Sequence, residues 1–237
     1  MAEREFDPYA PARPPTMAEL PYEDGEPLES PRHRQQMALL VETLRYHFRD
    51  DPEVYIGANM AVYFSAIEKV RPAFKAPDFF VVLGAEPGRY RTSWVTWEEN
   101  GTVPEVIIEL LSASTEREDR GRKMSIYGQA RVSAYYLFDP RTAALEGYSR
   151  DFSGRRWLEL RPDAVGALEC APLQLRLQVL PGEYEGEGGD WLRWIDGEGR
   201  VLPTPAEAER ERAEAERARA DAAEAELARL RALLAAR

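Results

Sequence analysis

The stretch that decides the fold is VPEVIIELLSASTEREDRGRKMSIYGQARVSAYYLFDP, residues 103–140. Within it, residues 106–111 form an almost continuous apolar run of strand length, as expected for a strand covered on both faces. A polar turn follows at 112–115, then an amphipathic helical segment to about residue 130 and a second apolar run at 134–138. This strand–helix–strand order predicts two parallel strands joined by a right-handed crossover.

A carboxylate, Glu109, interrupts the first apolar run. An unpaired buried carboxylate costs several kcal/mol, so Glu109 needs a charged partner or a metal ion. Two residues bear on this need: Lys123 on the helical segment can supply the opposite charge, and Asp78, which follows a proline at the start of the β-rich run 78–83, can share a metal ion with Glu109.

The chain before this stretch divides into a lead-in and a set of short elements. Residues 1–30 are rich in Pro, Glu and Asp and predict an extended segment with a short helix near Met17. Pro31 opens a helix with one apolar stripe, because proline is well placed in a first turn. Strands are predicted at 54–57, 60–64 and 78–83, the first two joined by a tight turn at Ala58 and Asn59, and residues 86–101 predict a loop or an edge.

The chain after residue 140 predicts a meander and a tail. Strands are expected at 144–149, 156–160 and 173–180, followed by an acidic, glycine-rich loop at 182–190 and a small hairpin at 191–197. Residues 205–237 are nearly all Ala, Glu, Arg and Leu and predict a long helix. Its heptad seam holds alanine and leucine but is broken by Glu216 and Arg237, so self-association through a coiled coil stays open.

These elements predict an α/β fold with a mixed α+β sheet. We expect three regions: the lead-in 1–30, one domain at 31–200 with flanking helices and a C-terminal β meander, and the helical tail 205–237. Thr115 and Glu118 are spaced as a capping box for the helix after the first strand.

Composition excludes several classes. The single cysteine, Cys170, excludes an intrachain disulfide and a cysteine-built zinc site, and two histidines make histidine-built hydrolase centres a poor fit. No apolar run approaches the roughly 20 residues of a membrane helix and the first residues do not resemble a signal peptide, so we expect a cytoplasmic protein with no membrane partner. The net charge of -11 argues against a broad basic surface for nucleic acid, although metal ions can supply positive charge locally.

Two acids and a lysine at the edge of a sheet suit metal-dependent phosphodiester hydrolysis. Carboxylate oxygens select Mg²⁺ or Mn²⁺. The metal activates water and neutralises charge on the phosphate, and a lysine helps to hold or polarise the nucleophile.

The same residues resemble a known family. Pro77-Asp78, the strand with Glu109-Leu-Leu-Ser112, the Asp119-x3-Lys123-x3-Tyr127 helix and the Ala134-Tyr-Tyr-Leu-Phe-Asp-Pro strand together are similar to the Uma2 family of the PD-(D/E)XK restriction-endonuclease-like superfamily. The resemblance spans roughly residues 31–200. It implies a nuclease-like core with Asp78, Glu109 and the backbone carbonyl of Leu110 as metal ligands. The superfamily places its lysine two residues after the second acid, where this chain has Leu111, so the resemblance assigns that role to Lys123.

Each of these residues has a structural alternative. Glu109 can pair with an arginine at a strand end, Asp78 can cap a turn after its proline, and Lys123 can form an ordinary surface pair with Asp119 four residues earlier. Tyr127 is expected to pack rather than to act, and His33, which opens the first long helix, can serve either the helix end or the site. Ser112 is expected to stabilise the turn.

Three functions remain open at this stage. The first is a Mg²⁺-dependent endonuclease acting on DNA, the second an RNA or nucleotide phosphodiesterase, and the third a non-catalytic binding or assembly module that acts through its helical tail. Fold alone does not decide between them. A cluster of basic residues near the site would grip the phosphates, aided by a homodimer through the tail: Arg71, Lys75, Arg89, Arg91, Arg117, Arg120 and Arg122.

Overall fold

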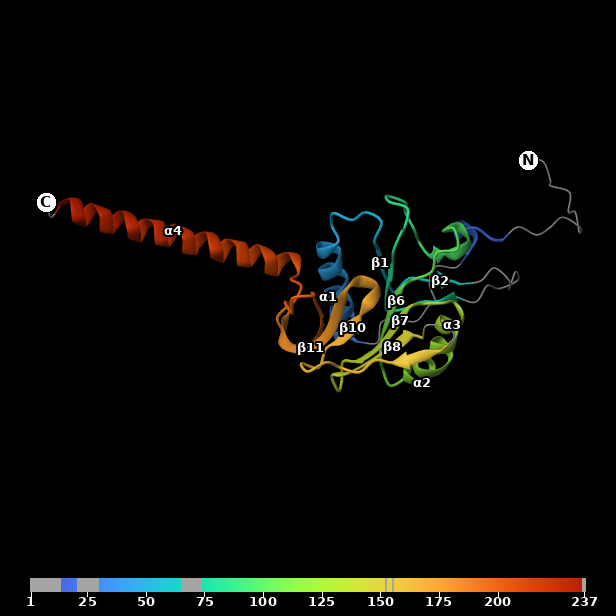
Figure 1. Ribbon diagram of the computed structural model, residues 1–237. Coiled ribbons are helices and arrows are strands. Elements are labelled where there is room, and N and C mark those ends of the chain that lie inside the picture. Colours follow the sequence, from blue (N-terminus) through green and yellow to red (C-terminus); the bar gives the residue numbers. More distant parts are fainter. Residues whose placement is uncertain (1–13, 21–29, 65–73, 152, 155, 236–237) are drawn as a thin grey trace, which may run out of the picture.

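A six-stranded mixed sheet forms the centre of the protein. The computed structural model describes residues 14–20, 30–64, 74–151, 153–154 and 156–235 (Figure 1). The strands of the central sheet lie in the order β1-β4-β6-β7-β8-β9, and only β6 and β7 are parallel neighbours. Their bounds are β1 (Tyr55–Ala58), β4 (Phe79–Val82), β6 (Val106–Leu110), β7 (Ala134–Asp139), β8 (Ala144–Arg150) and β9 (Trp157–Glu159). The predicted mixed α/β class and the parallel strand pair are confirmed.

Two smaller sheets and the helices complete the described fold. One sheet has the order β10-β11-β12 and the other β3-β2-β5. Their strands are β10 (Leu168–Cys170), β11 (Leu175–Tyr184), β12 (Glu187–Ile195), β3 (Phe74–Lys75), β2 (Val62–Tyr63) and β5 (Trp94–Val95). The helical segments are η1 (Met17–Glu19), α1 (Pro31–His47), η2 (Thr96–Glu98), α2 (Glu116–Glu118), η3 (Asp119–Lys123), α3 (Met124–Gln129), η4 (Ala171–Leu173) and α4 (Pro205–Ala235).

The central sheet is buried on both faces because a different layer covers each. Successive side chains of a strand point to opposite faces. On β6, Val106, Ile108 and Leu110 pack with α1 and the β10-β11-β12 sheet, whereas Ile107 faces the layer that holds α3, β2 and β5. All five residues of β6 are buried, as are all six of β7. This double coverage explains the continuous apolar runs in the sequence.

The helical segment between β6 and β7 is interrupted. One turn of α-helix, α2, leads into a π-helical stretch, η3, before α3 continues as α-helix. The predicted capping box is wrong, since the Thr115 side chain accepts no cap hydrogen bond. Instead the Ser112 hydroxyl accepts from the Thr115 backbone N–H at 3.1 Å and contacts the Thr115 hydroxyl at 2.9 Å, so Ser112 stabilises the turn as predicted. A short polar side chain can satisfy the local backbone from either position, and here the earlier residue does so.

One predicted hairpin and one predicted loop are wrong, whereas the turn predicted after Ile195 is confirmed by the antiparallel bridge between Ile195 and Val201. Strands β1 and β2, expected to pair across Asn59, belong to different sheets, since β1 pairs with β4 and β2 with β3 and β5. The stretch 182–190, expected as a loop, is part of a long hairpin in which β11 and β12 pair from Arg176 with Ile195 to Tyr184 with Glu187. The residues from Gly182 to Asp190 are mostly solvent-exposed. The glycine and acidic residues of this stretch are therefore typical of an exposed two-stranded ribbon and do not mark a loop. The segment expected as a loop or edge at 86–101 contains β5 and η2, and β10 was not predicted.

The helical tail leaves the globular part as a single rod (Figure 1). Its start is fixed by a capping box, in which the Thr204 hydroxyl accepts from the Glu207 N–H and the Glu207 carboxylate accepts from the Thr204 N–H. Glu207 also pairs with Arg193 of β12 at 2.7 Å. Of the lead-in, residues 14–20 and Ser30 are described, and the first of these stretches contains the short 3-10 turn expected near Met17; the rest of the lead-in lies outside the described residues. The three-region division stays a prediction.

A close approach between β1 and β4 gives the first testable expectation. Gly57 pairs with Phe80, and a Cβ on Gly57 would lie 2.3 Å from Cζ of the buried Phe80 ring. Gly57→Ala is therefore expected to lower the free energy of unfolding by about 1–3 kcal/mol, measured by urea denaturation. Gly197→Ala, where a Cβ meets nothing within 4 Å, serves as the matched control and should leave the midpoint unchanged. Equal stability of the two variants would show that Phe80 moves aside freely.

Candidate active site

Asp78 and Glu109 lie directly opposite each other at the end of the β4–β6 ladder. The antiparallel register pairs Phe79 with Ile108, so the next pair outward is Asp78 with Glu109. Opposite residues of such a ladder have Cβ atoms about 4.5–5.5 Å apart. Two cross-strand hydrogen bonds hold the arrangement: the Leu110 N–H donates to Asp78 Oδ2 at 2.7 Å, and the Asp78 N–H donates to Glu109 Oε2 at 3.3 Å.

Strand alternation places both acids on the face covered by α3. Asp78 alternates with Phe79 and so lies on the same face as Phe80 and Val82, and Glu109 lies on the same face as Ile107. Phe80, Val82 and Ile107 pack in the core layer under α3. Glu109 is fully buried. The predicted alternative of an arginine partner for Glu109 is not what the structure holds, because the cation next to it is Lys123.

Lys123 reaches the acids from the end of the π-helical turn η3. Its ammonium lies 3.0 Å from Glu109 Oε2 and 2.8 Å from Asp119 Oδ1. The expected pair with Asp119 is therefore present, but it is not a surface pair, since the Asp119 side chain is 1% exposed and that of Lys123 14%. Single π turns recur inside α-helices at functional sites. Here the turn carries Asp119 and Lys123 together to Glu109.

Tyr127 has a polar contact in addition to the expected packing. Its ring packs against Phe64 and Tyr135, and its hydroxyl donates to Glu109 Oε1 at 2.7 Å. Each Glu109 oxygen thus has a partner from α3 or η3. Tyr135 on β7, which sequence reasoning missed, donates its hydroxyl to the Asp119 backbone carbonyl at 2.9 Å. Only its place on the strand next to β6 could have pointed to it.

His33 connects the first long helix to the same ladder. Ser30 caps α1 by accepting from the His33 N–H, and its hydroxyl lies 3.1 Å from His33 Nδ1. His33 Nε2 lies 2.9 Å from the carbonyl oxygen of Leu110. Because that oxygen is an acceptor, Nε2 carries the proton and donates. His33 therefore serves the helix end and touches the residue after Glu109 at once.

Burial changes the proton affinity of the acid pair. Burial raises the pKa of Glu109 to about 8, the Asp78 and Asp119 carboxylates add to the rise, and Lys123 opposes it. Burial likewise raises the pKa of Asp78 to about 6, against the opposing effects of Lys123 and of the hydrogen bond from the Leu110 backbone. At neutral pH the two raised pKa values favour one proton shared between the two acids.

Lys123 shows the opposite preference within the same cluster. Burial lowers its pKa, but the Glu109 and Asp119 carboxylates outweigh burial and raise the pKa above its usual value. The raised pKa of Glu109 and the raised pKa of Lys123 are in conflict, since a protonated, neutral Glu109 no longer stabilises the charged form of Lys123. We place the proton on the acid pair and the charge on Lys123, because Asp119 holds Lys123 independently.

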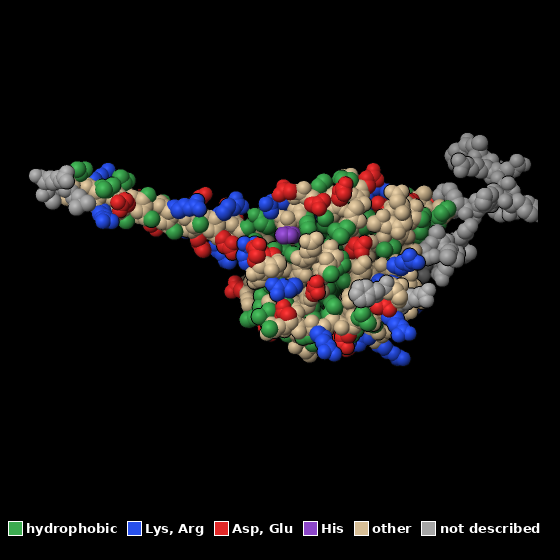
Figure 2. Space-filling model, in the orientation of Figure 1, with side chains coloured by type: hydrophobic (Ala, Val, Ile, Leu, Met, Phe, Trp, Pro, Cys, Tyr) green, Lys and Arg blue, Asp and Glu red, His purple; other side chains and the backbone are tan. Residues whose placement is uncertain are grey.

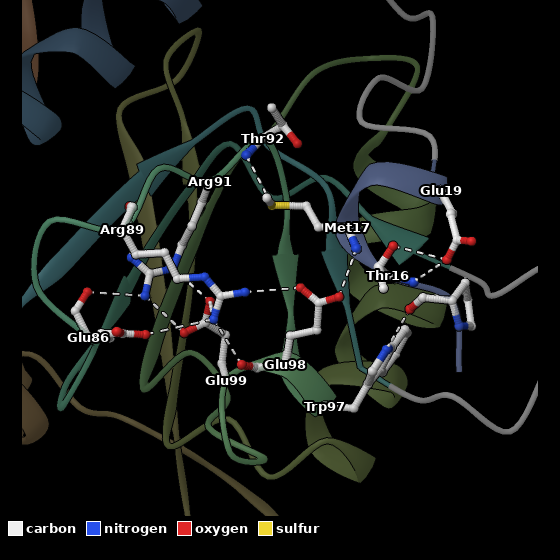
Figure 3. Close-up of polar contacts among 11 residues, drawn as sticks. Thr16, Met17, Glu19, Glu86, Arg89, Arg91, Thr92, Trp97, Glu98 and Glu99 are labelled. Atoms are coloured by element: carbon white, nitrogen blue, oxygen red, sulfur yellow. Dashed lines mark hydrogen bonds and ion pairs between the residues drawn. The ribbon is translucent and has the colours of Figure 1, made fainter. Parts of the chain in front are cut away.

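Most of the basic residues expected near the site are already paired. Arg91 is buried and donates to both Glu99 oxygens, at 2.7 and 2.9 Å, and Arg89 bonds Glu98 (Figure 3). Further pairs join Lys75 to Glu118 and Arg120 to Glu116 and Glu146. Arg117 and Arg122 are exposed and have no ion pair with any described side chain, whereas Arg71 lies outside the described residues. The expectation of a free basic cluster is therefore corrected to two exposed arginines.

The acid pair fits a divalent cation. Asp78 and Glu109 offer adjacent carboxylate oxygens, which Mg²⁺ and Mn²⁺ prefer, and a cation would replace their shared proton. Within the described part of the chain, no three His, Cys, Asp or Glu side chains form a ready-made metal site. Mg²⁺ needs none, because it binds through one or two carboxylates, waters and substrate phosphates. The Leu110 carbonyl keeps a second lone pair beside the His33 bond and could complete the protein ligands.

Fold and site together define a mixed α/β domain with an acid pair, of which Glu109 is buried and Asp78 half-buried, and a lysine on one face of its central sheet. The chain belongs to the Uma2 family, whose model, described as "Putative restriction endonuclease", matches residues 5–180. A solved structure from Anabaena variabilis ATCC 29413, described as "a putative nuclease belonging to DUF820", is 16% identical with a TM-score of 0.43, covering 64% of this chain and 88% of that chain. No curated protein matches the chain.

Among the described residues, no helix combines the length and the apolar character that crossing a membrane requires.

The raised pKa of Glu109 predicts how stability depends on pH. Since its folded-state pKa lies above the ordinary value of 4.5, its contribution is complete below pH 4.5 and is lost as the pH rises through about 8. In chelator, the free energy of unfolding of the wild type should therefore fall between about pH 5 and pH 8, because raising a pKa by one corresponds to about 1.4 kcal/mol. Glu109→Gln cannot titrate and should flatten this fall. Glu159→Gln, at an exposed position of β9, is the control and should keep the wild-type slope. Parallel profiles for all three proteins would contradict the raised pKa.

Proposed function

We propose that the protein is a metal-dependent endonuclease that hydrolyses phosphodiester bonds in DNA. The observation that carries the proposal is the register of β4 and β6, which sets Asp78 opposite Glu109 with Lys123 at 3.0 Å from the Glu109 carboxylate. The family description of a restriction endonuclease supports the reaction class. Asp78 and Glu109 are the residues that would hold Mg²⁺ or Mn²⁺, with the Leu110 carbonyl as the third protein ligand.

A bound divalent cation supplies an activated water nucleophile and neutralises charge developing on the phosphate. Lys123 contributes positive charge rather than proton transfer. Its pKa lies above the usual value, so it is a poor general base near neutral pH and a good electrostatic partner for a phosphate oxygen or the nucleophile.

The accessory residues hold these groups in place. The Tyr127 hydroxyl donates to Glu109 Oε1 and leaves Oε2 toward Lys123 and Asp78. Asp119 keeps Lys123 charged, and His33 orients the Leu110 carbonyl from the far side of the ladder. Since side-chain partners of metal ligands fix their orientation, we propose that Asp119, Tyr127 and His33 position the catalytic residues.

The acting species in this proposal is a homodimer, because each chain offers one acid pair and a DNA duplex has two strands. Arg117 on α2 and Arg122 within the π turn would add positive charge for the DNA backbone on an otherwise acidic protein.

Removing either acid should abolish cleavage. Asp78→Asn and Glu109→Gln are each expected to reduce DNA cleavage in Mg²⁺ or Mn²⁺ by about 100-fold or more and to abolish the Mn²⁺ binding heat seen by calorimetry. Glu159→Gln should behave as the wild type in both assays. The wild type should be tested on linear, supercoiled, single-stranded and branched DNA and on RNA. Cleavage of RNA alone would reassign the substrate, and no cleavage of any form would leave the non-catalytic binding module.

The two exposed arginines should contribute to DNA binding. Arg117→Gln and Arg122→Gln are expected to weaken binding across sequences and to reduce the slope of log affinity against log salt by about 1 each. Binding is measured by fluorescence anisotropy in Ca²⁺ at several salt concentrations. Arg161→Gln, an exposed arginine between β9 and β10, is the control. Unchanged slopes in both variants would place the DNA elsewhere on the surface.

A further inference from the structure

The free part of α4 carries an apolar stripe that the globular domain does not cover. Leu227, Leu230 and Leu234 are 53%, 48% and 72% exposed, and their spacing of three and four residues puts them on one face of the helix. From residue 214 onward every residue of α4 whose side chain is described is exposed. Figure 2 shows the rod leaving the globular part, with hydrophobic side chains gathered toward its free end.

The stripe continues inward as the seam of a heptad. With Leu227 and Leu234 at position a and Leu230 at d, the preceding seam positions are Ala223 at d and Ala220 at a. The next d position is Glu216, which would face its own copy in a symmetric pair. A self-paired seam therefore extends over residues 220–234, and the helix from Pro205 to that point remains a single rod.

The flanking charges identify the partner that fits this seam. In a parallel, in-register pair, each g position faces the e position five residues further along the partner helix. Arg219 then faces the partner's Glu224, and Glu226 faces the partner's Arg231, so both kinds of pair are attractive and each occurs twice. Among the described residues Arg219, Glu224 and Arg231 have no ion pair of their own, and Glu226 has only a long one to Arg229, at 3.7 Å. An antiparallel pair centred on the leucines would oppose Glu224 to the partner's Arg231 but offers Arg219 no acid.

We propose that two copies of the protein associate through a parallel, in-register coiled coil formed by residues 220–234 of α4. The short seam of two heptads, with alanine at two of its five positions, buries little apolar area, so the dimer is weak and concentration-dependent. The proposal goes beyond the proposed nuclease function, because its evidence lies wholly in α4. It places the two globular domains at the same end of the coiled coil.

Disulfide trapping in the full-length protein tests both the seam and its direction. The only native cysteine, Cys170, is fully buried, so an introduced cysteine reports alone. Ala223→Cys lies at a d position and should form a disulfide-linked dimer under mild oxidation. Ala225→Cys, two residues away at the outward f position, is the matched control and should stay monomeric. In the antiparallel pair the two thiols introduced by Ala223→Cys would be about 16 Å apart along the helix axis, too far to bridge.

Sedimentation of the wild type and of charge variants completes the test. The wild type should shift from monomer to dimer between low micromolar and near-millimolar concentration. Glu226→Arg should weaken the dimer, and adding Arg231→Glu should restore it. A wild type that stays monomeric throughout, equal trapping at 223 and 225, or a dimer that Ala223→Cys does not trap would each overturn the proposal. Since the readout is mass, a failure here removes the dimer formed through α4 but leaves the assignment of Asp78, Glu109 and Lys123 untouched, and loss of cleavage in the acid variants leaves this proposal untouched.

Discussion

The site depends on one constraint, the antiparallel register that puts two carboxylates opposite each other on a buried face. Like charges directly opposite on neighbouring strands destabilise a sheet. The structure answers with Lys123, which lies 3.0 Å from Glu109, and with hydrogen bonds from Tyr127 and from the backbone of the facing strands. The Tyr127 hydroxyl and the Lys123 ammonium, which contact the two Glu109 oxygens, both come from the segment over β6, so the crossover that joins the parallel strands also neutralises part of the pair's charge. Remaining negative charge gives the pair its affinity for a proton or a cation.

Much of this arrangement was predictable from the sequence, because burial on both faces leaves a plain trace. The runs around Glu109 and at 134–138 predict two covered strands, and an acid inside such a run requires a partner. The register that pairs Asp78 with Glu109 is not visible, since a displacement of β4 by two residues would keep the same hydrophobic alternation. Tyr127 was expected only to pack, because helical spacing places its ring in the core but says nothing of its hydroxyl. The π turn and the hydrogen bond of Ser112 depend on local backbone geometry that the spacing of residues in the sequence does not determine. The exposed end of the β11–β12 hairpin, residues 182–190, lacks the alternation of apolar residues that marks a half-buried strand.

The presence of Leu111 where the resemblance predicts a lysine, and of Lys123 on the following helix, has a simple geometric basis. Leu111 follows Glu109 by two residues and therefore lies on the same side as Glu109, where it packs, 1% exposed, in the core layer under α3. A lysine at that place would compete with this packing. Lys123 approaches the same face from the helical layer instead, and Asp119 one turn earlier holds its charge. A lysine at position 111 and Lys123 would each place a positive charge on the same side of the sheet. The absence of a lysine two residues after Glu109 therefore leaves the electrostatics of the acid pair intact.

Charge pairing across the rest of the molecule limits the positive charge that the proposed nuclease offers to DNA. Arg89, Arg91, Arg120 and Lys75 each lie against a glutamate, so they stabilise the loops around β5 and α2 rather than offering charge to a phosphate. The free positive charge of the described surface near the site then reduces to Arg117 and Arg122. Two arginines bind DNA only weakly, because each phosphate that they neutralise adds the release of only about one counterion to the affinity. Two domains held at one end of a coiled coil would present two such arginine pairs to one DNA duplex. Once the first domain is bound, the second domain would bind at the high effective concentration that the coiled coil sets. Weak sites joined in this way need no broad basic surface, which is consistent with a net charge of -11.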